Sequence, residues 1–98
     1  MRYLITTFDN GNIDWNNKAE LLRHEASSIW HLYKEQVICN IWFSEKKDAI
    51  FIIEAESMDI AEQIVGSLPL IKADLLRYSI TGLLPYTGLD RIMNQIDQ

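Results

Sequence analysis

The chain has few of the residues that brace small proteins or bind metal ions, with one cysteine, two prolines and four glycines among 98 residues. The single cysteine, Cys39, excludes an internal disulfide and a cysteine-rich zinc site, because a structural zinc ion needs four ligands. Cys39 lies in the strand-like segment Val37–Ile41. We expect it to be inert packing within a strand.

Basic residues are also few, with nine Lys and Arg against fourteen Asp and Glu and a net charge of −5. Proteins that bind nucleic acids carry a surplus of clustered Lys and Arg, whereas Lys46–Lys47 forms only a turn. No apolar run approaches the ~20 residues that span a membrane. The composition predicts neither a nucleic-acid partner nor a membrane-spanning segment.

Length and composition fit one domain over residues 1–98, since 48% apolar and 23% charged residues are usual for a globular chain. The first residues, Met1–Thr6, include one basic residue and pass directly into a strand-like alternation. They lack the long apolar stretch of a signal peptide. We expect a cytoplasmic protein.

Periodicity and turn residues predict four strands and two helices. Asn16 or Asn17 is expected to cap the first helix, with Glu20 in capping-box spacing to Asn17, and Ser57 to cap the second. Pro69 is expected to end the second helix. The predicted strands are Arg2–Phe8, Val37–Ser44, Ala49–Ala55 and Asp74–Leu84, and the predicted helices are Lys18–Tyr33 and Met58–Ser67.

This order is the β-α-β-β-α-β pattern of a ferredoxin-like α+β fold, with an antiparallel sheet and both helices on one face. If Val37, Cys39, Ile41, Phe43, Phe51 and Ile53 face the helices, the opposite face carries Ile38, Asn40, Trp42, Ser44, Ile50, Ile52 and Glu54. So large an exposed apolar patch normally marks an interface. We predict that two sheets pair face to face as a dimeric α/β barrel.

Glu25 is the residue of most functional interest, because it falls on the apolar half of the first predicted helix. At about 100° per residue, that half contains Ala19, Leu21, Leu22, Glu25, Ala26, Ile29, Trp30, Leu32 and Tyr33. A carboxylate rarely enters a core unless a charged or hydrogen-bonding group meets it. Two readings stay open: an ion pair with a residue such as Lys18, or a carboxyl group that transfers protons in catalysis.

Three segments of the chain resemble the muconolactone isomerase-like family, within the wider group of dimeric α/β-barrel proteins that includes the YciI-like proteins. These segments are Glu54–Ser57, Ser67–Leu70 and Gly82–Tyr86. The resemblance implies a ferredoxin-like protomer, dimers or larger rings of dimers, and a pocket between sheet and helices that a neighbour's C-terminal segment often covers. It also implies a cofactor-free proton shift in an unsaturated lactone.

Aligning the first helix with the family's Leu-Lys-x-Arg-Glu segment places the family's glutamate on Glu25. Leu21 keeps the leucine, but Leu22 replaces the lysine and His24 replaces the arginine. These two basic groups are absent here, so the resemblance does not carry the family's substrate over to this chain.

Four aromatic residues, Trp30, Tyr33, Trp42 and Tyr78, are candidates to line an apolar pocket for an unsaturated ring, with a tyrosine hydroxyl to orient it. The alternative for the same residues is plain core or interface packing. His24 and His31 lie seven residues apart, which is poor spacing for two metal ligands on a helix. We therefore expect no metal and no cofactor.

The function predicted from these features is a small cofactor-independent isomerase- or lyase-like enzyme that shifts a proton on an apolar carbonyl or lactone compound, with Glu25 as general acid or base. The alternative is a non-catalytic dimeric module that binds a small molecule or is structural. Leu89, Ile92 and Met93 have the spacing of a short C-terminal helix. This helix is expected to cover another subunit's pocket or to pack on its own chain.

Overall fold

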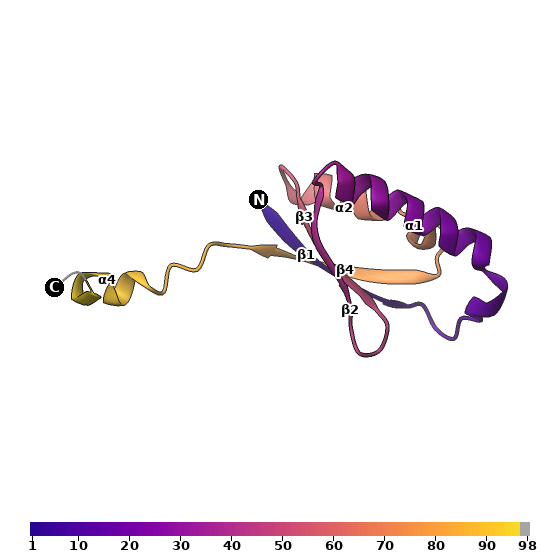
Figure 1. Ribbon diagram of the computed structural model, residues 1–98, viewed down its shortest axis with the longest axis horizontal. Helices are drawn as coiled ribbons and strands as arrows, with labels where there is room; N and C mark the ends of the chain where they lie inside the picture. The colour runs from indigo at the N-terminus through magenta and orange to yellow at the C-terminus, as the bar shows by residue number, and fades with distance from the viewer. Residues whose placement is uncertain (97–98) are drawn as a thin grey trace.

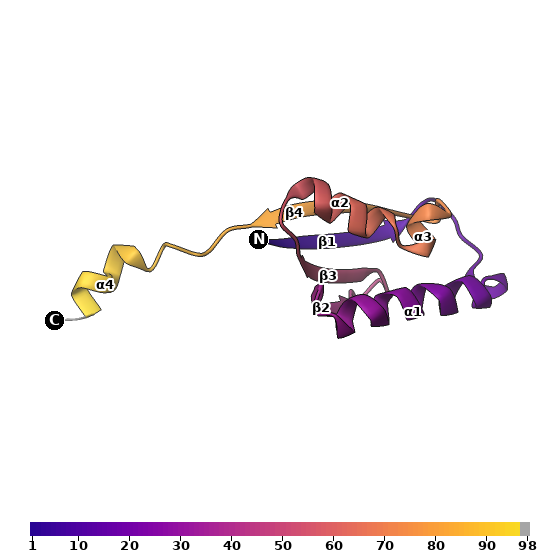
Figure 2. The ribbon, with the colours of Figure 1, turned by 90° about the horizontal axis from the view of Figure 1, so that it is seen from above.

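The computed structural model describes residues 1–96, in which a four-stranded antiparallel sheet is covered on one face by helices (Figures 1 and 2). The strand order is β2-β3-β1-β4. The elements are β1 (Arg2–Asp9), the 3₁₀ turn η1 (Trp15–Asn17), α1 (Ala19–Lys34), β2 (Ile38–Phe43), β3 (Ala49–Glu54), α2 (Met58–Gly66), α3 (Pro69–Lys72), β4 (Leu76–Leu83) and α4 (Asp90–Ile96). The predicted β-α-β-β-α-β order and α+β class are confirmed.

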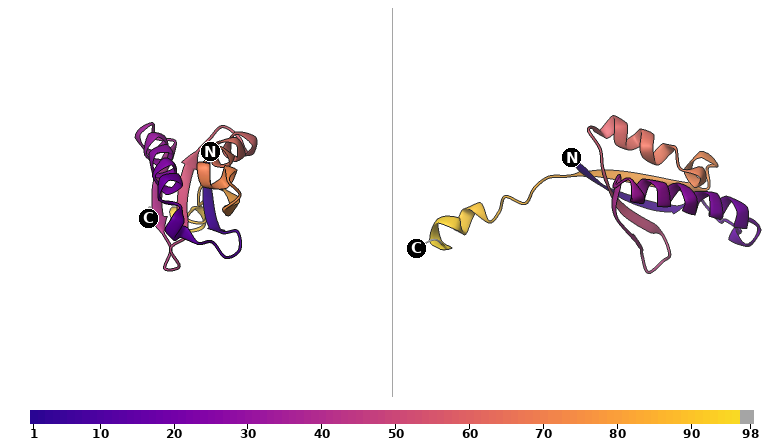
Figure 3. Two further views of the ribbon diagram at one scale, coloured as in Figure 1. Left: turned by 90° about the vertical axis from the view of Figure 1, so that its right-hand side faces the viewer. Right: turned by 45° about the horizontal axis from the view of Figure 1, so that its top comes forward.

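The helices form two groups side by side on the same face of the sheet, as the end-on view of Figure 3 shows. One group is α1, and the other is α2 with α3. Between them and the sheet lies a core that includes Tyr3, Ile5, Ile38, Phe51, Ile53, Ala61, Val65 and Leu68. Ile29 and Leu32 of α1 pack against this core. Strand alternation thus buries one face of β1 and β3, and helix periodicity turns Ala61 and Val65 of α2 into the core.

The start of α1 differs from the expected capping box at Asn17 and Glu20. Asp14 accepts a hydrogen bond from the Asn16 N–H at 3.1 Å and begins η1. Asn17 therefore already lies in a helical turn, and its Oδ1 accepts from Lys18 Nζ at 3.0 Å. Lys18 is the N-cap of α1 and makes no side-chain capping bond. The predicted Asn16 or Asn17 cap is wrong because the preceding turn occupies both residues.

The end of α2 also differs in one respect from the prediction. Ser57 caps α2 as expected, its Oγ accepting from the Ile60 N–H at 3.3 Å. Pro69 follows the end of α2 but begins the one-turn helix α3, which was not predicted. Proline suits the first position of a helix, because its missing N–H would have no partner there.

A β-bulge in β2 changes the predicted faces of that strand. Ile38 pairs with Ile53 and Asn40 pairs with Ile52, so Cys39 is an extra residue without a partner. Ile38 consequently turns into the core and is buried, contrary to the prediction that it faces outward. Beyond the bulge the register agrees with the prediction, since Ile41 pairs with the buried Phe51.

The chain leaves α1 through a left-handed residue, Gln36, with φ +65°. The Gln36 N–H donates to the Tyr33 carbonyl at 3.1 Å, and the Val37 N–H donates to the Leu32 carbonyl at 2.9 Å. These are the two bonds of a Schellman motif, in which glycine usually occupies the left-handed position. The motif sends the chain directly into β2.

The outer face of the sheet carries Leu4, Thr6, Phe8, Trp42, Ile50 and Ile52, of which Trp42 is 53% exposed and Phe8 45% exposed. After β4 the chain runs away from the sheet and enters α4, which lies far from the other helices (Figure 1). Tyr86, Leu89, Ile92 and Met93 are exposed there. Within residues 1–96, no helix combines the length and apolar character needed to cross a membrane.

Candidate functional site

A cavity of about 910 Å³ lies between α1 and the β2–β3 hairpin. The hairpin bends away from α1 toward its tip, which opens the space between them (Figures 1 and 3). Most of the lining is apolar, and it includes Leu22, Ala26, Ile29, Ile41, Phe43, Phe51, Leu68, Leu70, Ile71 and Leu76. Such a concave apolar surface with a few polar groups is typical of a small-molecule site.

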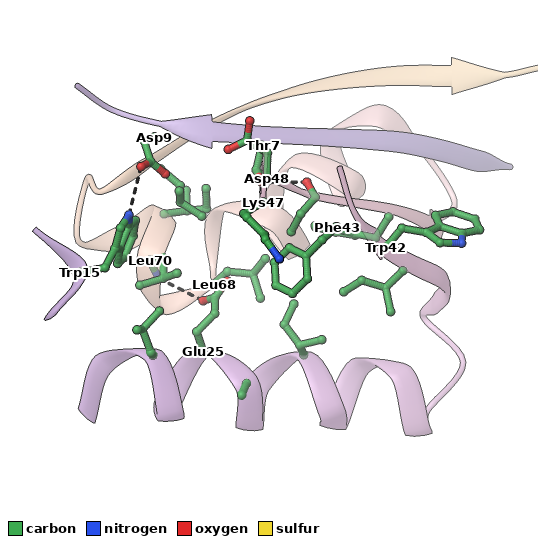
Figure 4. Close-up of a pocket in the computed structure, with 18 of the residues that line it drawn as sticks. Thr7, Asp9, Trp15, Glu25, Trp42, Phe43, Lys47, Asp48, Leu68 and Leu70 are labelled. Carbon is green, nitrogen blue, oxygen red and sulfur yellow. Dashed lines mark hydrogen bonds between the residues drawn. The ribbon is translucent and has the colours of Figure 1, made fainter. Parts of the chain in front are cut away.

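Glu25 projects into this cavity from the middle of α1 (Figure 4). Its Oε1 atom accepts a hydrogen bond from the Leu70 N–H at 3.1 Å. Pro69 has no N–H, so Leu70 carries the first free N–H at the start of α3. Glu25 therefore caps α3 from a distant part of the chain.

Burial raises the pKa of the Glu25 carboxyl above its ordinary value, because removal from water disfavours the charged form. The hydrogen bond from Leu70 opposes this effect and lowers the pKa, but burial is the larger cause. The carboxyl group is thus shifted toward the pH range in which it can both accept and release a proton.

No cation pairs with Glu25 among the residues that the structure describes. Lys18, the partner considered from the sequence, directs its amine to Asn17 instead. The ion pairs within residues 1–96 join Glu54 to the N-terminal amine and to Arg2. Glu25 thus keeps a structural bond to Leu70 and also has open space beside it.

The structure brings three of the four predicted aromatic residues to the cavity and places the fourth elsewhere. Trp30 and Tyr33 line it from α1 and stack with ring centroids 6.4 Å apart. Trp42 lines one end, with its indole directed away from Glu25 (Figure 4). Tyr78 lies on β4 opposite Thr7 and packs against the core, outside the cavity lining.

Several polar lining residues were not predicted from the sequence. At one end, Trp15 Nε1 donates to an Asp9 carboxylate oxygen at 3.0 Å (Figure 4). At the hairpin, Lys46, Lys47 and Asp48 line the cavity. The sequence marked Lys46–Lys47 as a turn, and only the packing of the fold shows that these residues line the same cavity as Glu25. The buried Thr7 also lines it and donates to the Ala49 carbonyl at 2.8 Å.

Metal ligation finds no support in the described part of the chain, where no three His, Cys, Asp or Glu residues are grouped to hold an ion. His24 and His31 both lie on the exposed side of α1. The polar groups that line this cavity are carboxyl, amine, hydroxyl and indole N–H groups.

The element order and the four-stranded antiparallel sheet define a ferredoxin-like α+β fold. Among solved structures, the protein is similar to muconolactone isomerase, with a TM-score of 0.76 and 14% sequence identity over 90% of this chain and 93% of that chain. It is also similar to the 5-chloro-2-hydroxyhydroquinone dehydrochlorinase of Burkholderia phenoliruptrix AC1100, with a TM-score of 0.65 and 19% identity. That match covers 90% of this chain and 98% of the dehydrochlorinase, which was solved with 2,5-dihydroxybenzoquinone.

Neither a protein-family model nor a curated protein sequence matches the chain. At these identities the similarity establishes the fold, and it confirms the muconolactone isomerase-like architecture expected from the sequence. What the cavity does must be argued from its own residues.

Proposed function

We propose that this protein is a small cofactor-independent enzyme of isomerase or lyase type that shifts a proton on an apolar carbonyl or lactone compound. Glu25 is the general acid or base. One observation carries the proposal: a carboxyl group with a raised pKa stands in a largely apolar cavity and forms no ion pair with any described residue. Perturbed acids in such clefts are typical of catalytic sites.

The Leu70 N–H holds one carboxylate oxygen of Glu25, and the other makes no hydrogen bond within residues 1–96. That free oxygen takes a proton from a carbon next to the substrate carbonyl, and the electron pair of the C–H bond moves into an enolate. Return of the proton to another carbon completes an isomerisation. Loss of a leaving group from the neighbouring carbon completes an elimination instead.

We assign Trp30, Tyr33 and Trp42 to substrate binding, because their rings border the apolar space in which an unsaturated ring fits. Tyr78 is not part of this assignment, since it packs in the core. The two similar structures support the chemical class. One is by name an isomerase of a lactone, and the other was solved with a small carbonyl-containing ring.

We also propose that the protein works as a homodimer or larger homo-oligomer in the cytoplasm. Leu4, Ile50 and Ile52 on the outer sheet face supply the apolar surface for pairing. The segment from Tyr86 to Met93 makes an exposed apolar strip that suits a second subunit better than water. The free cysteine, Cys39, is compatible with a reducing compartment.

The test is proton exchange in D₂O with muconolactone and with 2,5-dihydroxybenzoquinone, followed by NMR. The wild type should incorporate deuterium into the compound or convert it. Glu25→Gln should lower the rate of exchange or conversion by about 10²–10⁴-fold. Glu62→Gln, on the exposed side of α2, is the matched control. Equal rates in Glu25→Gln and wild type would refute the role of Glu25.

The second candidate is a non-catalytic dimeric binding module, which the size of the cavity favours. Native mass spectrometry of the purified protein would detect a retained small molecule and its assembly state together. A ligand recovered chemically unchanged, with no exchange of its protons in D₂O, would favour this module over the enzyme.

A further inference from the structure

The positive charge in the cavity comes from one place, the turn between β2 and β3. Lys46 and Lys47 are the cationic residues among the described residues that line it. The acids Glu25, Asp9 and Asp48 also line it, and the Asp9 carboxylate is held by the indole of Trp15 at 3.0 Å. The two lysines therefore place the ammonium groups of the cavity at the hairpin end, next to the Asp48 carboxylate of the same turn.

Backbone hydrogen bonds fix the turn that carries these lysines. The Ser44 N–H donates to the Asp48 carbonyl at 2.8 Å, and the Lys47 N–H donates to the Ser44 carbonyl at 2.9 Å. The Ser44 hydroxyl oxygen also accepts from the N–H groups of Lys46 and Asp48, each at 3.2 Å. Within this turn Lys47 takes a left-handed conformation with φ +69°. The direction in which its side chain leaves the backbone is thus set by the turn.

Lys47 extends from the turn into the cavity, toward the side on which α1 lies (Figure 4). Its amine makes no hydrogen bond and no ion pair with another described residue. Lys47 is an exposed residue that also lines the cavity, so its ammonium group can form a charge-assisted hydrogen bond with an anionic oxygen that enters there.

We propose that Lys47 binds an anionic oxygen substituent of the molecule that occupies this cavity, so that the site selects apolar compounds carrying one negative charge. This rests on the proposed function of the cavity as a substrate site. With its charged group at Lys47, the apolar part of the ligand lies along Ile29, Ile41 and Phe51, next to Glu25. Lys47 is then a positioning residue that orients the ligand for proton transfer.

Two fluorescent probes with closely related skeletons test this inference. Anilinonaphthalene sulfonate carries one anionic group, and N-phenylnaphthylamine lacks it. The variants are Lys47→Met, which removes the charge at similar length, and the control Lys72→Met on α3, an exposed lysine outside the cavity. A third variant, Ala26→Trp, fills the cavity from α1. Circular dichroism verifies that each variant folds.

Lys47→Met should weaken binding of the sulfonate by about fivefold or more, as expected for loss of a charged hydrogen bond. It should leave the uncharged probe unchanged, and Lys72→Met should change neither. The role of Lys47 would be overturned if wild type and Lys47→Met bound the sulfonate with equal affinity. The ligand site itself would still stand in that case if Ala26→Trp prevented binding of the uncharged probe. Failure of the uncharged probe to bind, or binding insensitive to Ala26→Trp, would contradict the proposed ligand site itself.

Discussion

The Oε1 atom of Glu25 accepts a hydrogen bond from the Leu70 N–H at 3.1 Å, and this contact ties the middle of α1 to the first turn of α3. One carboxyl group therefore has a structural partner and a free oxygen at the same time. Because a structural acid and a catalytic acid respond differently to substitution, the two roles can be separated by experiment.

Replacement of Glu25 by Gln should not lower the melting temperature, because the Gln side-chain oxygen can still accept from Leu70. Glu25→Ala removes the acceptor and should lower the free energy of unfolding by about 1–2 kcal/mol, since the Leu70 N–H loses its partner. Thermal and urea unfolding of both variants measure the difference. An equal loss in Glu25→Gln would show that the negative charge itself stabilises the fold.

The stability of the wild type should depend on pH through Glu25. Its pKa is raised in the folded state, so the folded protein binds the proton more tightly than the unfolded chain. Its stabilising contribution is complete below the ordinary pKa and is lost as the pH rises through the higher pKa of the folded state.

Urea unfolding of the wild type and Glu25→Gln from about pH 4 to pH 8 tests this sign. As the pH rises above about 4.5, the Gln variant should gain stability relative to the wild type. The difference in free energy of unfolding between the two proteins should become constant once the pH exceeds the pKa of Glu25 in the folded state. Glu62→Gln is the matched control for an acid outside the cavity. If the Gln variant instead lost stability relative to the wild type as the pH rose, the folded state would favour the ionised form of Glu25.

Pairing through the outer sheet face predicts that one charge there breaks the assembly. Ile52 lies on this face, opposite Leu4 and Asn40. Ile52→Lys should convert the oligomer to monomers in sedimentation velocity with the fold retained, because an unpaired ammonium is expensive to bury. The control is Gln63→Lys on the exposed side of α2, which should leave the assembly unchanged. An Ile52→Lys protein that assembles as the wild type does would move the interface elsewhere.

Gln36→Gly should stabilise the protein by about 0.5–1 kcal/mol, because Gln36 holds a left-handed conformation that glycine adopts without steric conflict. Urea unfolding measures the gain. The position is exposed, so no packing is lost. Gln63→Gly in the interior of α2 should instead lower stability. A loss of stability in Gln36→Gly would show that the Gln side chain makes a contribution of its own.

Most of the fold followed from local sequence signals, and the exceptions have physical causes. Alternating apolar residues located β1, and Ser57 marked the start of α2, because each of these signals acts within a few residues. The bulge at Cys39 could not be predicted, since it depends on how Ile38 and Ile53 meet across two strands. The turn of α3 was missed because Pro69 fits both an end and a beginning of a helix.

The candidate site could be predicted only where one helix carries it. The apolar half of α1 pointed to Glu25, Trp30 and Tyr33 because their spacing alone places them on one side. Glu25's partner, the Leu70 N–H, is 45 residues away, and a backbone donor leaves no mark in a sequence. Lys47 sits in a polar turn and Asp9 at the polar end of β1, where the sequence does not distinguish residues that face a cavity from those that face water.

The bulge in β2 gives that strand a spare residue. A deletion in a strand ordinarily exchanges its two faces, but loss of Cys39 would leave Ile38, Asn40 and Ile41 in regular inward, outward and inward order. Evolution can therefore shorten this strand by one residue at this point without turning its core residues to water. Alignments of homologous chains should accordingly tolerate a gap at Cys39 more readily than anywhere else in the sheet.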